Sequence, residues 1–347
     1  MTSVRGDLAR AQALLDVKRY DEAASLLSLV VAVEPTDSRA WCLLAAAHLG
    51  IAQYQEATAA ASRAITLAPS DDWPYRLAST AQQRLGHATA AWKAATEACR
   101  VAPDGWRPYV CLAKAELARQ QVDFDAAERA AARARELAPD QPDVHYVSGL
   151  VSFTLAHWKA ARAHQERALA LNPAHSGALN ELGRIKLRRG SPAHAARHFI
   201  HAAQSAPGES IYGQNVDLAV RSAVAQTIYI AYIGIFVLLC ATMFGHLSRV
   251  TAVTGLAAPA ALGAGFGAAQ LWRMPPEARP LFRTRQIALP LGMVYGSILI
   301  VVVAATVVPA SALTGTALAG IGLIFASGVA AGQILRRKQK RVKIPGT

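Results

Sequence analysis

Acidic residues are almost absent from the last third of this 347-residue sequence. Residues 226–347 contain one acidic residue, Glu277, and 11 lysines and arginines, whereas residues 1–225 contain 22 acidic and 25 basic residues. The net charge of +13 is therefore concentrated in the second part. A basic total can indicate nucleic-acid binding. Here the excess borders long apolar segments, so we expect a lipid bilayer and no nucleic acid as a partner.

Motifs for metal binding, disulfides and catalysis are also missing. The four cysteines, at positions 42, 99, 111 and 240, form no Cys-x-x-Cys pair, so neither a disulfide framework nor a zinc site is indicated. There is no Gly-x-Ser-x-Gly elbow and no phosphate-binding loop. His194, His198 and His201 share one helix face, a spacing that could chelate a transition metal, but no carboxylate or cysteine accompanies them. A solvated histidine face is favoured, and we expect no enzyme, cofactor or metal site.

Proline recurs at a fixed period in the first part, at positions 35, 69, 103, 139, 173 and 207. Twelve residues before each proline lies an alanine: Ala23, Ala57, Ala91, Ala127, Ala161 and Ala195. Twelve residues further back, five repeats have a second small residue: Ala11, Ala45, Ser79, Gly149 and Gly183. Helices that cross closely need small residues, and a proline ends the helix before it. Each period therefore predicts two helices of about a dozen residues.

The break between the two helices is marked by an aromatic residue at Tyr20, Tyr54, Phe124 and Trp158. The pattern resembles the tetratricopeptide repeat (TPR) family over about residues 4–207, as six repeats, and most closely in segments 40–69 and 178–207. The aromatic residue at the family's fourth position appears as Trp41, Tyr75 and Tyr109. The first repeat departs from the pattern with Asp7 at that position, and the fourth has two extra residues near 119–125.

This resemblance implies that the first helices of the repeats line a groove that binds a protein partner. The residues at the family's ligand-facing positions are Arg39, Arg76, Arg84, Arg107, Lys114, Tyr146, Asn180, Arg184 and Arg188. A basic wall with aromatic members suits an acidic or C-terminal peptide, because cations donate charge-assisted hydrogen bonds to carboxylates. The other interpretation, solvated solubility charges, stays open. The lysine–asparagine pattern of chaperone-tail-binding TPR clamps is not reproduced.

Four long apolar segments follow, at about 227–247, 250–271, 287–308 and 312–335. About 20 such residues are needed to cross a bilayer as a helix. Segment 273–285 carries four arginines and the tail at 336–343 six basic residues, and such segments stay in the cytoplasm. The first residues lack the apolar core of a signal peptide. We therefore expect a multi-pass plasma-membrane protein with both termini cytoplasmic. Glycines four residues apart suit packing of these helices together or against other membrane-protein helices.

The sequence thus predicts an all-α protein, a TPR α-solenoid followed by a four-helix transmembrane bundle. The expected boundaries are 1–209 for the solenoid, 210–225 for a capping helix, 226–335 for the membrane domain and 336–347 for a basic tail. The expected function is a membrane-anchored scaffold that recruits a cytosolic protein to the plasma membrane or assembles a membrane complex. The alternative is a membrane transport or lipid-handling component regulated by the TPR domain.

Overall fold

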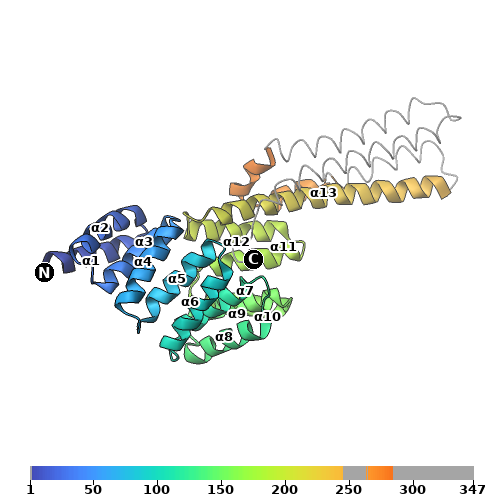
Figure 1. The fold of residues 1–347 in the computed structure, drawn as a ribbon. Coiled ribbons are helices and arrows are strands. Elements are labelled where there is room, and N and C mark those ends of the chain that lie inside the picture. The colour runs from blue at the N-terminus through green and yellow to red at the C-terminus, as the bar shows by residue number, and fades with distance from the viewer. Residues whose placement is uncertain (1, 245–262, 264, 284–347) are drawn as a thin grey trace. The chain divides into compact units, whose positions relative to one another are not determined.

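The computed structural model describes residues 2–244, 263 and 265–283 (Figure 1), and the side chains of its longest helix are described as far as Ile230. The described chain divides into two compact units, the first ending at Pro173 and the second beginning at Ala174. The predicted spans at 287–308 and 312–335, the basic tail and most of the predicted span at 250–271 lie outside the described residues. The domain boundaries proposed from the sequence stay a prediction.

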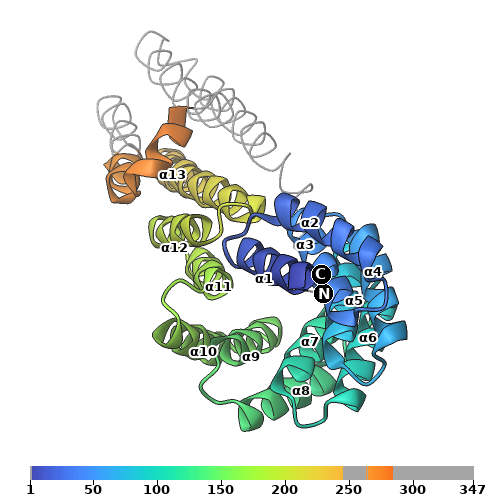
Figure 2. The same cartoon turned by 90° about the vertical axis from the view of Figure 1, so that its left-hand side faces the viewer.

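The first unit consists of five helix pairs in which consecutive helices pack against each other. Each first helix also contacts the first helix of the next pair. In Figure 2 the first helices follow an inner arc and α2, α4, α6 and α8 an outer arc. The helices are α1 (Thr2–Asp16), α2 (Tyr20–Val33), α3 (Ser38–Gly50), α4 (Tyr54–Leu67), α5 (Asp72–Arg84), α6 (Ala88–Val101), α7 (Trp106–Leu117), α8 (Phe124–Leu137), α9 (Pro142–Thr154) and α10 (Trp158–Leu171).

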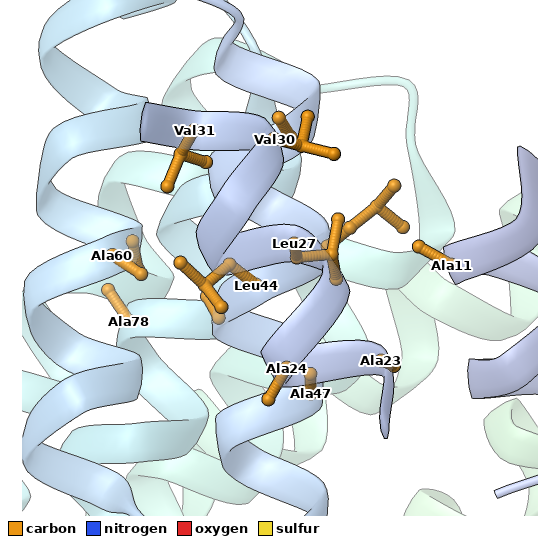
Figure 3. Close-up of a cluster of buried hydrophobic side chains, with 14 residues drawn as sticks. Ala11, Ala23, Ala24, Leu27, Val30, Val31, Leu44, Ala47, Ala60 and Ala78 are labelled. Atoms are coloured by element: carbon orange, nitrogen blue, oxygen red, sulfur yellow. The ribbon is translucent and has the colours of Figure 1, made fainter. Parts of the chain in front are cut away.

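Small buried side chains let the paired helices approach closely. The six alanines that precede the repeat prolines by twelve residues are all fully buried, with no exposed surface. Opposite Ala91, the Ser79 hydroxyl donates a 2.8 Å hydrogen bond to the Ala91 carbonyl, so the backbone and a short side chain touch across the crossing. Figure 3 shows the core formed by α1–α5, where alanines alternate with Leu27, Val30 and Leu44. The predicted close crossings are therefore confirmed.

A recurring hydrogen bond joins the start of four helix pairs to the end of the preceding pair. The side chain at the fourth repeat position is joined to the carbonyl of the proline six residues earlier. The four pairs are Trp41 Nε1 with Pro35 (2.9 Å), Tyr75 with Pro69 (3.2 Å), Tyr109 with Pro103 (3.1 Å) and His145 Nε2 with Pro139 (2.7 Å). These carbonyls lie just beyond the end of a helix, where no backbone N–H of the helix can reach them. A side-chain donor therefore takes its place.

The turns within the pairs use left-handed backbone two residues before the second helix begins. Gly86 (φ 81°) and Gly190 (φ 73°) adopt it without steric cost, but Lys18 (φ 62°), Ala52 (φ 61°) and Ala156 (φ 59°) have a Cβ that disfavours it. The longer fourth turn, before α8, instead uses Asp123 as an N-cap that accepts from the Ala126 amide at 2.9 Å.

The second unit begins with a further pair, α11 (Ser176–Arg188) and α12 (Pro192–Ser205). It continues into α13 (Ser210–Phe244), a helix of 35 residues that packs against α12 and touches α11. The segment predicted as a capping helix and the start of the first predicted span thus lie in one helix. Residues 265–273 form another helical stretch, followed by the 3-10 helix η1 (Pro276–Arg283). Where side chains are described, no helix is both long and apolar enough to cross a membrane.

Candidate protein-binding surface

Six of the predicted binding residues lie on the first helices of the first unit, and we call them the inner row: Arg39, Arg76, Arg84, Arg107, Lys114 and Tyr146. Two hydrogen-bonding contacts join α5 to α7. Gln83 Nε2 donates to the Lys114 carbonyl at 3.0 Å, and Cys111 Sγ lies 3.9 Å from the Arg76 carbonyl. Lys114 Nζ in turn lies 5.2 Å from the centre of the Tyr146 ring on α9. Residues from three consecutive first helices are therefore neighbours.

Two cations of the inner row, Arg76 and Arg107, already contact a side chain of their own helix. Arg76 Nε pairs with Asp72, one turn earlier on α5, and both side chains are about three-quarters buried. The Arg107 guanidinium lies 4.6 Å from the centre of the Trp106 ring. Arg39 and Arg84 are exposed, at the first and last turns of their helices. The surface is basic, but an anion would share Arg76 with a carboxylate that is already present.

The cysteine thiols near this surface are shielded from water. Burial raises the pKa of Cys99 to about 12, and also that of Cys42 to about 12. Burial likewise raises the pKa of Cys111, which contacts α5. The thiolate is the nucleophilic form of cysteine, and burial disfavours that form at these positions.

Asn180, Arg184 and Arg188, the other predicted residues, lie on α11 in the second unit. Arg184 Nη1 donates to both carboxylate oxygens of Glu181 at 2.9 Å. Asn180 donates to Glu181 at 3.3 Å and accepts from Asn215 of α13 at 2.7 Å. Glu181 is buried, and burial raises its pKa despite the opposing effect of Arg184. Two of the three predicted residues therefore belong to an internal network between α11 and α13.

A second buried carboxylate, at the end of α7, was not anticipated from the sequence. Glu116 accepts a short hydrogen bond from Trp92 Nε1 of α6 and pairs with Arg119 Nη1 at 2.9 Å. The Arg119 guanidinium also lies 4.9 Å from the centre of the Trp92 ring. This cluster fixes the last turn of α7 just before the longer turn. A contact between residues 24 positions apart has no local signal in the sequence.

The histidine stripe lies on α12. His194 and His201 are exposed on α12, and no three metal-ligating side chains come together in the described part of the chain. An open pocket between α1 and α2 is lined by Arg10, Leu14, Asp21, Glu22, Ser25 and Leu26.

Comparison with known proteins identifies the repeat type. A family model described as tetratricopeptide repeat matches residues 38–71, which cover α3 and α4. Among solved structures, the chain is similar to one from the APC/C hetero-tetramer Cut9–Hcn1, with 17% identity and a TM-score of 0.50 over 61% of this chain and 42% of that one. The chain thus spans less than half the length of that relative. Among curated proteins none matches the sequence.

Two further solved structures are similar over most of their own length. The type IV pilus biogenesis factor PilW is 12% identical over 62% of this chain and 98% of that one, with a TM-score of 0.48. Pseudomonas aeruginosa pilF is 14% identical over 61% and 96%, with a TM-score of 0.45. At these identities the likeness concerns the fold alone. The described helix pairs form an all-α helical solenoid of TPR type, and residues 38–71 match the tetratricopeptide repeat itself.

Proposed function

We propose that this protein is a membrane-anchored scaffold whose inner row binds an acidic segment of a protein partner. The observation that carries the proposal is the position of Lys114. It is joined through its backbone to Gln83 of α5 and lies over the Tyr146 ring of α9. Three consecutive first helices thereby present cations and an aromatic ring side by side, in a form that an extended chain could follow.

The chemistry of this surface favours carboxylates over other ligands. Arginine and lysine donate charge-assisted hydrogen bonds to carboxylates, and the Tyr146 ring offers apolar contact to the methylene groups of the ligand. Because exposed cations such as Arg84 act over several ångströms of water, binding should weaken as salt is added.

The anchoring half of the proposal rests on the sequence. Four uncharged apolar segments of about 20 residues are bordered by arginine-rich segments at 273–285 and 336–343. The first apolar segment begins inside α13, so the pair α11–α12 would be joined to the membrane by a continuous helix. The scaffold would then hold its partner at the inner face of the plasma membrane, or assemble a membrane complex there, with both termini cytoplasmic.

The test uses the full-length protein, crosslinked in native membranes and purified by affinity. The double variant Arg84→Glu and Lys114→Glu should lose the partner at least tenfold while the protein stays in carbonate-washed membranes. The control, Arg63→Glu with Arg129→Glu, makes the same change in charge at exposed positions of the second helices α4 and α8. If the control loses the partner and the inner-row variant keeps it, the partner does not bind the inner row.

A further inference from the structure

Residues 265–279 lie beside α13 in the second unit (Figure 1), and η1 contacts α13. Gln270 Nε2 donates to Gln226 Oε1 at 3.4 Å, and Gln226 Nε2 donates to the Gly190 carbonyl at 3.2 Å. Gly267 lies so close to α13 that a Cβ there would come within 2.9 Å of Thr227 Cγ2. We call this region, with the neighbouring face of α12, the junction.

The junction is tied together on its α12 side as well. Arg197 Nη2 of α12 donates to the Arg273 carbonyl at 3.3 Å. The Arg279 guanidinium donates to the Trp272 and Met274 carbonyls, both at 3.1 Å. Met274 is buried beneath this turn. The segment therefore holds the side chains at its surface in defined positions.

Large apolar side chains are exposed on both segments of the junction, α13 and residues 265–273. Seven large hydrophobic side chains are exposed in the described residues, and three of them are here: Tyr229 (67% exposed), Leu271 (39%) and Trp272 (79%). Single exposed apolar residues are ordinary, but tryptophan and tyrosine next to an apolar segment are typical of the headgroup level of a bilayer. Their rings are apolar at one end and polar at the other, as that boundary requires.

The charges on the two elements beside these rings are mostly positive. Arg273 follows Trp272 and is exposed, and Arg197 is exposed on α12. Residues 192–205 of α12 contain no acidic residue, and residues 265–283 contain one, Glu277. A cationic surface beside amphipathic rings attracts anionic lipid headgroups, since arginine binds phosphate oxygens with charge-assisted hydrogen bonds.

We propose that the junction contacts the headgroup layer of a membrane that contains anionic phospholipid. In this arrangement Trp272 and Tyr229 insert among the headgroups, and Arg273 and Arg197 bind lipid phosphates. The inference rests on the proposed membrane anchoring and deepens it by naming the lipid class and the residues. The order along α13 agrees with it. The polar residues Gln226 and Thr227 come first, the exposed Tyr229 follows, and the remaining residues to Phe244 carry no charge.

One consequence concerns the pair α11–α12. Arg197 belongs to α12, and Gln226 binds the turn between α11 and α12 through the Gly190 carbonyl. Lipid contact at the junction would therefore set the orientation of α11 and α12 relative to the bilayer. Asn180 and Arg184 lie on α11.

The first experiment measures where Trp272 lies. The full-length protein is placed in nanodiscs of phosphatidylcholine and phosphatidylglycerol, with or without phosphatidylcholine carrying a nitroxide on its headgroup. The nitroxide should quench a larger fraction of the tryptophan fluorescence in the wild-type protein than in Trp272→Phe. The reason is that only the wild type has an indole at the headgroup level. Trp73→Phe, a matched change on α5 in the first unit, should keep the extra quenching.

The second experiment measures lipid preference by electron spin resonance of chain-labelled lipids. Labelled phosphatidylglycerol should associate with the wild type several-fold more strongly than labelled phosphatidylcholine. Arg197→Gln with Arg273→Gln should remove most of this preference. Arg63→Gln with Arg129→Gln, which changes the net charge equally on the first unit, should keep it.

The possible results separate this inference from the proposed function. Release of the protein from native membranes by carbonate would overturn the anchoring and the inference together. Carbonate resistance with equal quenching of the wild type and Trp272→Phe would overturn the inference alone. Loss of a crosslinked protein in Trp272→Phe, with no change in quenching, would mean that a protein and not lipid covers the junction. Equal association of both lipids would remove the anionic preference.

Discussion

Gly183→Ala should destabilise the second unit, although alanine is the better helix former. Gly183 lies inside α11, where replacing glycine with alanine ordinarily gains about 1 kcal/mol. A Cβ at this position would come 2.5, 2.6 and 2.9 Å from three ring carbons of Phe199, about 1 Å less than an ordinary carbon contact. Phe199 is fully buried, so its ring has no free space to enter. Overpacking of this kind costs about 1–3 kcal/mol and should outweigh the gain.

The expected net loss of stability is about 1 kcal/mol or more. Each kcal/mol lost lowers the melting midpoint by about 2–4 °C. It is measured by circular dichroism of the full-length protein in mild detergent. Gly213→Ala on α13 is the control, because no atom lies within 4 Å of its Cβ position. That variant should melt higher than the wild type. Adding Phe199→Leu to Gly183→Ala should recover part of the loss, as a coupling between contacting residues requires. A Gly183→Ala protein that melts as high as Gly213→Ala would refute the close crossing.

The helix pairs could be predicted because their determinants are local. The second helices end where the prolines predict, and the residue before each proline is the C-cap: Glu34, Ala68, Ala102, Ala138, Asn172 and Ala206. Tyr20 and Tyr54 begin second helices, as expected. A proline beyond the first turn of a helix disfavours helical backbone at the residue before it, and this is a local effect that needs little tertiary information.

The binding residues could be placed on helices but not assigned partners. The repeat register locates Arg76 and Arg184 on first helices, but not the pairing of Arg184 with a buried glutamate. Nor could it reveal that Asn180 binds Asn215, 35 residues further along the chain. His145 was missed at the fourth repeat position because histidine stands there in place of tryptophan or tyrosine. Its Nε2 makes the same bond to a proline carbonyl, while its buried Nδ1 has no partner among the described residues.

Two further predictions follow from the turns and from the buried network. Ala52→Gly should raise the melting midpoint, because it removes the strain of an alanine in left-handed backbone and so stabilises the fold by about 0.5–1 kcal/mol. Gly86→Ala should lower the melting midpoint by a similar amount, because it introduces that strain. The opposite result for either would mean that these turns adopt another backbone conformation. Glu181→Gln tests the buried carboxylate through pH. Burial raises the pKa of Glu181 in the folded protein, so as pH rises the unfolded chain loses this proton first, at around pH 4. The stability from Glu181 is therefore fully present below that pH and is lost as pH rises through the folded pKa. Glutamine has no proton to lose, so denaturant unfolding between pH 4 and pH 8 should show the wild type losing stability relative to the variant as pH rises. A wild type that instead gains on the variant over this range would mean that Arg184 outweighs burial and holds the carboxylate ionised.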